Sequence, residues 1–271
     1  MQGSIGRTVE GSQSGGRTMT GRWSRWATLV VTFAGIGTPW LLARKAMDLD
    51  DPAVQAVTFL PAPYSYIVWA PIYAGFLLFA VWQALPAQAE NRRVAAIRPW
   101  LMSTAVLNSA WAAALADRNP AWTVAIVGAM LVVAIGMHQA GLIGQATAGP
   151  VEAWLRVPFS LYLGWLILAT FVNVTIVLAR IGWDGFGWSP VTWGILAIVV
   201  SSIIGLITRF RLDDPVLGGA LVWGYLAIVV QQQQRPLVSL FAGLAAGIVL
   251  LSLFISDRQA PRSTHSECAE V

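Results

Sequence analysis

The chain has 271 residues, of which 56% are hydrophobic and only 11% are charged, and its mean hydropathy is +0.64. Soluble domains carry about a quarter charged residues, so this composition excludes a soluble protein and indicates a polytopic membrane protein in contact with the lipid bilayer. The formal net charge of +4 falls in loops and tails, where it is a topology signal. No nucleic-acid partner is therefore predicted.

Cysteine and histidine are too few for the common metal and disulfide sites. The one cysteine, Cys268, lies in the polar C-terminal tail, which excludes an internal disulfide framework and a cysteine-based metal cluster. The only histidines are His138 and His265, and the second is also in the tail, so a two-histidine haem site between helices is excluded. No metal site is predicted.

Eight apolar runs, each long enough for a transmembrane helix, lie between two polar tails formed by residues 1–25 and 256–271. In chain order the runs cover residues 26–43, 64–84, 99–116, 121–143, 158–179, 190–208, 216–231 and 236–255. The seventh run is short and continues into the glutamines 231–234, so whether it crosses the membrane fully is left open. The predicted fold class is an all-α integral membrane protein with about eight transmembrane helices.

The basic residues indicate how these helices are oriented. With eight spans, 12 arginines fall on the side of the two termini, and four arginines with Lys45 fall on the other side. By the positive-inside rule both termini are predicted to be cytoplasmic, in a multi-pass protein of a bacterial plasma membrane. No run has Asp, Glu, Lys or Arg in its interior, which argues against ion-coupled transport and against carboxylate catalysis within the membrane. No catalytic residue is therefore predicted.

Three of the runs place aromatic and amide side chains at helical spacing in otherwise apolar sequence. They are Trp69 and Tyr73 in the second run, Asn108 and Trp111 in the third, and Trp165, Ala169 and Asn173 in the fifth. An amide within the hydrocarbon needs a hydrogen-bond partner, whereas tryptophan offers a broad apolar face with a single donor. At about 1.5 Å per residue most of these groups reach one level in the outer half of the membrane. They predict a pocket for a flat, largely apolar molecule.

A long loop over residues 44–63 lies above this level and ends in the stiff Pro61-Ala-Pro63 element. A loop of this length in a compact bundle is often a lid. Two alternatives stay open: the tryptophans could belong to the aromatic belt at the membrane interface, and Asn108 and Asn173 could join helices by hydrogen bonds. Asp184, in the sequence WDGFGW, is predicted to lie in a turn beside aromatic anchors.

These stretches resemble the translocator protein family, also called the tryptophan-rich sensory proteins (TspO/MBR). In that family a proline-containing loop leads into a second helix with a W-x-x-x-Y pattern, the third helix carries L-N-x-x-W, and the fifth carries W-x-x-x-A-T-x-x-N. The matching positions here are Pro61, Trp69 and Tyr73; Leu107, Asn108 and Trp111; and Trp165, Ala169, Thr170 and Asn173. The resemblance covers residues 26–180, and residues 181–255 add three further helices.

The resemblance implies a five-helix bundle with a pocket under the loop between helices one and two. Family members bind porphyrins and, in animals, cholesterol and synthetic aromatic drugs, and some bacterial members are reported to promote light-dependent porphyrin breakdown. The chain departs from the family in two places. The loop has Phe-Leu-Pro-Ala-Pro in place of W-x-P-P, and no tyrosine precedes Arg180, so cholesterol binding is not supported.

The resulting hypothesis is a membrane receptor or carrier for a porphyrin-like or other flat apolar ligand, with a sensory or regulatory role. Its predicted ligand-binding residues are Pro61, Trp69, Tyr73, Asn108, Trp111, Trp165, Ala169 and Asn173. Porphyrin is predicted as a possible ligand, and no cofactor is predicted. Whether the protein forms a homodimer is left open. The alternatives are light-dependent porphyrin breakdown and uncoupled transport of an apolar solute.

The additional helices contain a short internal sequence repeat. Residues 193–200 and 223–230 share seven of eight identities, and each begins with Trp-Gly. This pattern is consistent with helix duplication or with coincidence in the limited alphabet of apolar helices.

Overall fold

The computed structural model describes residues 23–39, 42, 51–117, 120–142 and 150–255, and these are helical with short connections and contain no strand. The first helix covers residues 23–39. It is followed by α2 (Pro52–Ala56), η1 (Pro63–Val68), α3 (Trp69–Ala84), η2 (Pro86–Gln88), α4 (Arg92–Ala116), α5 (Pro120–Met137), the π-helical turn η3 (His138–Leu142), α6 (Pro150–Arg180), η4 (Gly185–Gly187), α7 (Pro190–Leu212), α8 (Pro215–Gln231) and α9 (Pro236–Ser252). The predicted all-α fold class is confirmed.

The eight long helices correspond to the eight predicted apolar runs, but two of them begin well before their runs. Helix α4 begins at Arg92 and α6 at Pro150, where the predicted starts were residues 99 and 158, and both helices continue through an internal proline at those places. Hydropathy detects only the apolar part of a helix, so it did not detect the more polar first turns of α4 and α6. Most of the predicted tails and residues 44–50 of the loop lie outside the described residues.

Capping residues that are visible in the sequence set several helix starts. Asp214 and Ser189 each accept a hydrogen bond from backbone N–H groups at the N-termini of α8 and α7, and each precedes a proline at the first helical position. Asn91 caps α4 in the same way by accepting bonds from the next turn. These short signals explain where α4, α7 and α8 begin.

Four helical segments are long and apolar enough to cross a membrane: Pro63–Ala84, Ala121–Ala140, Arg156–Arg180 and Pro190–Leu212. Helices α8 and α9 are apolar but shorter. Large apolar side chains are exposed along α7 and α9, for example Ile203, Ile207, Leu244 and Ile248. Such a surface is costly in water and suits lipid, so the chain is an all-α integral membrane protein.

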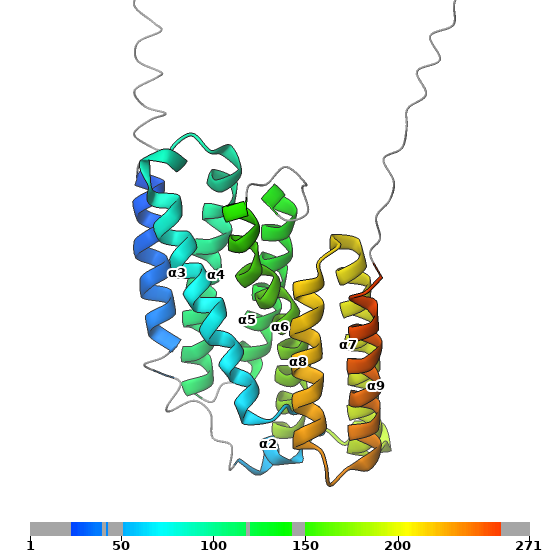
Figure 1. Ribbon diagram of the computed structural model, residues 1–271. Coiled ribbons are helices and arrows are strands. Elements are labelled where there is room, and N and C mark those ends of the chain that lie inside the picture. Colours follow the sequence, from blue (N-terminus) through cyan, green and yellow to red (C-terminus); the bar gives the residue numbers. More distant parts are fainter. Residues whose placement is uncertain (1–22, 40–41, 43–50, 118–119, 143–149, 256–271) are drawn as a thin grey trace, which may run out of the picture.

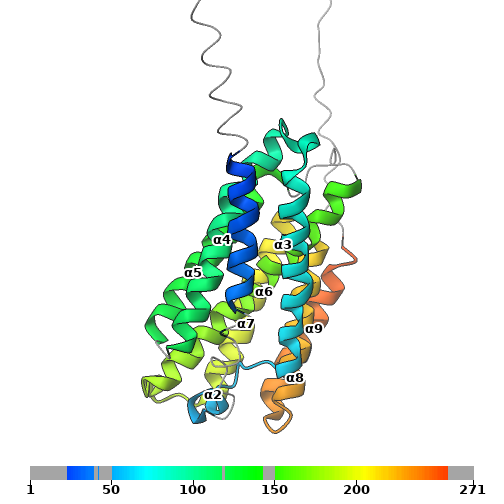
Figure 2. The same cartoon turned by 90° about the vertical axis from the view of Figure 1, so that its left-hand side faces the viewer.

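Helix α6 is the centre of the bundle (Figures 1 and 2). It packs against α3 and α5 on one side and against α7 and α8 on the other, and α9 packs on α7 and α8. The contact between α3 and α6 is close at Gly75, where an added Cβ would lie 2.3 Å from the ring of Pro158. The first described helix starts, and α9 ends, at the same end of the bundle, as an even number of crossings requires (Figure 1).

Candidate functional site

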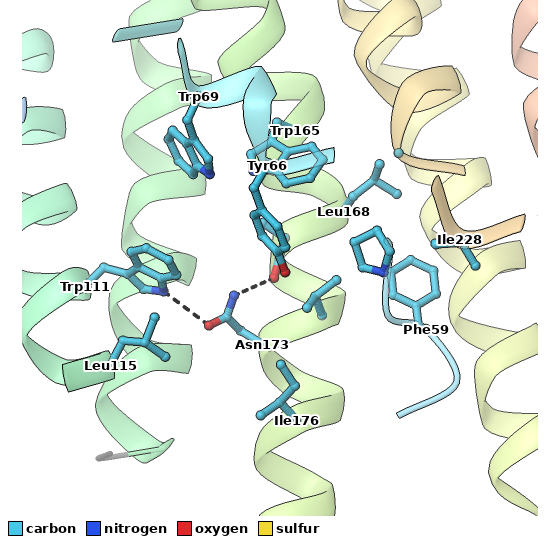
Figure 3. Close-up of a pocket in the computed structure, with 14 residues that line it drawn as sticks. Phe59, Tyr66, Trp69, Trp111, Leu115, Trp165, Leu168, Asn173, Ile176 and Ile228 are labelled. Carbon is cyan, nitrogen blue, oxygen red and sulfur yellow. Dashed lines mark hydrogen bonds between the residues drawn. The ribbon is translucent and has the colours of Figure 1, made fainter. Parts of the chain in front are cut away.

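A cavity of about 70 Å³ lies between η1, α3, α4, α6 and α8 (Figure 3). Its lining is Phe59, Pro61, Tyr66, Trp69, Trp111, Leu115, Trp165, Leu168, Ala169, Val172, Asn173, Ile176, Gly224 and Ile228. Six of the eight predicted ligand-binding residues are among these, namely Pro61, Trp69, Trp111, Trp165, Ala169 and Asn173. The structure therefore brings most of the predicted set to one cavity.

Asn173 is the only amide in this lining, and it is held by two hydrogen bonds (Figure 3). Its Oδ1 accepts from the indole Nε1 of Trp111 at 3.2 Å, and its Nδ2 donates to the carbonyl oxygen of Ala169 at 2.8 Å. Because a carbonyl oxygen has two lone pairs, Asn173 Oδ1 keeps the capacity to accept a second hydrogen bond. The amide thus fixes the Trp111 ring and still offers an acceptor beside the cavity.

Aromatic rings form much of the remaining wall. Trp69 stacks on Trp111 with ring centroids 6.4 Å apart and an interplanar angle of 28°. Tyr66 meets Trp165 edge to face, with centroids 5.7 Å apart. Trp165 is only 2% exposed, which places it in the interior and not in an interfacial belt. Aromatic surfaces of this kind favour a flat apolar ligand, because stacking adds to the burial of area.

Tyr73 and Asn108, the other two predicted residues, lie outside the lining. Asn108 is 1% exposed, and its Oδ1 accepts from the Tyr73 hydroxyl at 3.2 Å. Its Nδ2 donates to the carbonyl of Thr104 at 2.8 Å and to the hydroxyl of Tyr162 at 3.2 Å. The Asn108 amide therefore joins α3, α4 and α6, as the helix-joining alternative anticipates.

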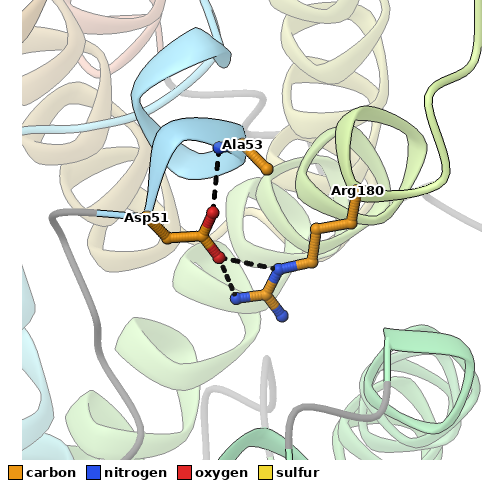
Figure 4. Close-up of polar contacts among 3 residues, drawn as sticks. All are labelled: Asp51, Ala53 and Arg180. Carbon is orange, nitrogen blue, oxygen red and sulfur yellow. Dashed lines mark hydrogen bonds and ion pairs between the residues drawn. The ribbon is translucent and has the colours of Figure 1, made fainter.

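The described part of the first loop is fixed at one end by an ion pair with α6 (Figure 4). Asp51 Oδ2 accepts hydrogen bonds from Nη2 and Nε of Arg180 at 2.9 and 3.2 Å. Its Oδ1 accepts from the backbone N–H of Ala53 at 2.9 Å and so caps α2. The two side chains are 21% and 17% exposed, so this ion pair, with two hydrogen bonds to one carboxylate oxygen, is largely removed from solvent.

Helix α8 holds the rest of the loop over the cavity. The N–H of Ala62 donates to the carbonyl of Ala227 at 3.0 Å, and the indole of Trp223 donates to the carbonyl of Ser65 at 3.0 Å. The amide Nε2 of Gln232 lies 3.3 Å from the carbonyl oxygens of both Val57 and Leu60. The loop is therefore closed by contacts with a helix that lies beyond the five-helix unit.

A family model for TSPO-like proteins matches residues 26–255, which cover all eight long helices except the first three residues of the first one. The chain belongs to the TSPO-like protein family. The match continues through α7, α8 and α9, beyond the residues 26–180 that carry the sequence motifs. Searches among curated proteins and among solved structures found no match.

Sequence reasoning missed the contribution of α8 to this TSPO-like site. Gly224 and Ile228 complete the wall, and an added Cβ at Gly224 would lie 2.1 Å from Cδ1 of Leu168. The only sequence signal was the repeated Trp-Gly at residues 193–194 and 223–224, which carries no chemistry by itself. The glycine leaves room for the side chain of Leu168 where α8 approaches α6 at the cavity.

The closed cavity of this TSPO-like protein is smaller than a ligand site. Pockets for drug-sized ligands usually have volumes of about 300–1,000 Å³, against about 70 Å³ here. A flat macrocycle can enter only if the loop and the half-buried rings of Trp69 and Trp111 move apart. The described residues contain no group of three or more His, Cys, Asp or Glu that could hold a metal ion.

Proposed function

We propose that this TSPO-like protein is a membrane receptor or carrier that binds a flat, largely apolar ligand of the porphyrin type. The observation that carries the proposal is the convergence of Tyr66, Trp69, Trp111 and Trp165 with one amide on a single cavity under a loop. The aromatic faces would stack on the ring system, and Asn173 would accept a hydrogen bond from a pyrrole N–H or a protonated edge group.

Ligand entry in this proposal requires a change of the loop. The ion pair of Asp51 with Arg180 and the hydrogen bonds from α8 stabilise the closed state, so binding competes with them. A ligand that holds the loop open would alter the surface that Arg180 and Asp51 present. In this proposal both termini are cytoplasmic and the loop lies on the opposite side of the membrane. The changed surface of the loop would transmit the sensory or regulatory signal.

Titration of the purified protein with protoporphyrin, followed by quenching of tryptophan fluorescence, tests the proposal. We expect saturable binding that weakens about fivefold in Trp165→Phe, because the smaller ring stacks less well. Trp122→Phe is the matched control, because Trp122 is 62% exposed and does not line the cavity. Binding that is equally strong in the wild type and Trp165→Phe would contradict the assignment of the site.

Illumination of the saturated complex separates the receptor from its enzymatic alternative. If the protein is only a receptor or carrier, the porphyrin absorbance falls under light no faster in the complex than for free porphyrin in the same detergent. Light-dependent loss of the absorbance with formation of a product, abolished in Trp165→Phe, would assign the same cavity to porphyrin breakdown instead.

A further inference from the structure

A second and larger cavity lies on the other side of α6, against α7 and the turn η4. Its volume is about 500 Å³, within the range for ligand sites. Residues 56–58 of the loop, helix residues 171–179 of α6 and residues 190–200 of α7 contribute to its lining. None of the predicted ligand-binding residues lines it, so it is separate from the site described above.

The mouth of this second cavity is aromatic. Trp183, Trp188 and Trp193 all line it, and Trp193 lies next to both of the others, with ring centroids 4.8 Å and 5.7 Å away. The indole Nε1 of Trp193 donates to the carbonyl of Gly185 at 2.9 Å, which fixes this ring against η4. Three indole rings around one opening offer π-faces on which a cation is attracted by the ring quadrupole.

Asp184 supplies a negative charge at the same mouth. Its Oδ1 accepts from the backbone N–H of Phe186 at 3.0 Å, and among the described residues it has no ion-pair partner. The nearest arginine in the sequence, Arg180, is paired with Asp51. No lysine or arginine lines the cavity, so the carboxylate of Asp184 is the one charged side chain in its lining, beside the indole faces.

The deeper part of the cavity is apolar and runs along the helices. Phe171, Val174 and Leu178 of α6 face Ala197 and Val200 of α7 across it. From Pro190 to Val200 the groove follows α7 for roughly 15 Å, at about 1.5 Å per residue. Val200 and Leu196 are also partly exposed on the lipid-facing surface, so the groove can be reached from the bilayer.

We propose that this cavity binds a single-chain amphiphile with a quaternary ammonium headgroup, which enters from the bilayer. The headgroup lies between Trp183, Trp188 and the carboxylate of Asp184, and the alkyl chain lies along the groove between α6 and α7. A charged aromatic mouth above an apolar channel matches the two halves of such a molecule. An anionic or uncharged headgroup gains no such attraction, so the site selects by charge.

Electron paramagnetic resonance of chain-labelled amphiphiles tests this proposal. The full-length protein is placed in nanodiscs of phosphatidylethanolamine and phosphatidylglycerol, which lack choline headgroups. The probes are dodecyltrimethylammonium and dodecyl sulfate, each with a nitroxide on the chain, and the immobilised fraction is measured against probe concentration. We expect the wild type to bind the ammonium probe about tenfold more tightly than the sulfate probe.

Two variants address the mouth, and one exposed tryptophan outside the cavity provides the control. Asp184→Asn removes the charge but keeps an oxygen for the N–H of Phe186, so the turn is preserved, and we expect about tenfold weaker binding of the ammonium probe alone. Trp188→Leu removes one indole and should weaken binding about fivefold. Trp122→Leu, which changes an exposed tryptophan outside the lining of the cavity, should change nothing.

Two outcomes would overturn the proposal. Equal immobilisation of the ammonium and sulfate probes by the wild type would show that the tryptophans serve only as an interfacial belt. Unchanged ammonium binding in Asp184→Asn would show that the carboxylate plays no part in a headgroup site. Protoporphyrin titration of Asp184→Asn keeps this test distinct from the first cavity, since binding there should be unchanged.

Discussion

Phe59 and Phe171 join the two cavities of this protein, because their rings are in contact with centroids 5.8 Å apart. Phe59 lines the smaller cavity and Phe171 lines the larger one. Phe59 is fully buried and belongs to the loop, which also sends Val57 and Thr58 to the larger cavity. One loop therefore covers both sites, and any movement that opens one of them changes the wall of the other.

The ion pair of Asp51 with Arg180 is expected to keep this loop closed. In Asp51→Asn the pair is lost while the amide oxygen can still accept from Ala53, so the effect is confined to the loop. Pairs with this partial exposure contribute about 1 kcal/mol, which corresponds to an about fivefold larger equilibrium population of the open loop. Hydrogen–deuterium exchange of residues 53–62 in nanodiscs measures this directly.

The reversed pair serves as the control for that prediction. Asp51→Arg combined with Arg180→Asp restores opposite charges and should return exchange in residues 53–62 toward the wild-type rate, whereas each single change should not. If Asp51→Asn exchanges as slowly as the wild type, the hydrogen bonds from α8 alone hold the loop.

The two asparagines of the predicted site should behave differently when they are replaced. Asn108→Leu leaves the hydroxyls of Tyr73 and Tyr162 without this buried partner and should lower the free energy of unfolding by about 1–3 kcal/mol. Asn173→Leu frees the Trp111 ring at the cavity and should chiefly weaken protoporphyrin binding. Thermal unfolding in detergent and fluorescence titration of both variants separate the roles. A larger loss of binding in Asn108→Leu than in Asn173→Leu would contradict this division.

Local sequence patterns anticipated the helices and six of the fourteen residues that line the first cavity, because apolar runs and i, i+4 spacing are properties of one helix at a time. Trp165 and Asn173 could be assigned to one face of α6 in this way. The same reasoning could not place Gly224 beside Leu168, since that contact depends on how α8 packs against α6. It also could not distinguish Asn108 from Asn173, because their partners come from other helices.

Close packing of α3 on α6 makes Gly75 sensitive to even a methyl group. In Gly75→Ala the new Cβ would overlap the ring of Pro158, which is part of a helix and cannot rotate away, so we expect a loss of about 1–3 kcal/mol in the free energy of unfolding. Gly128→Ala, in the interior of α5 with nothing within 4 Å, should be neutral or stabilising by up to about 1 kcal/mol. Thermal midpoints in the same detergent compare them, and equal midpoints would contradict the close contact.

A small substitution in α8 should impair ligand binding without unfolding the protein. In Gly224→Ala the new Cβ would lie 2.1 Å from Cδ1 of Leu168, and this flexible side chain can turn into the cavity that both residues line. The space for the ligand then shrinks, so protoporphyrin affinity should fall about tenfold with little change in thermal midpoint. Gly219→Ala is the matched control on the same helix, because nothing lies within 4 Å of its added Cβ. Unchanged affinity in Gly224→Ala would show that α8 does not form part of the ligand site, whereas an equal loss in both variants would point to a general effect on α8.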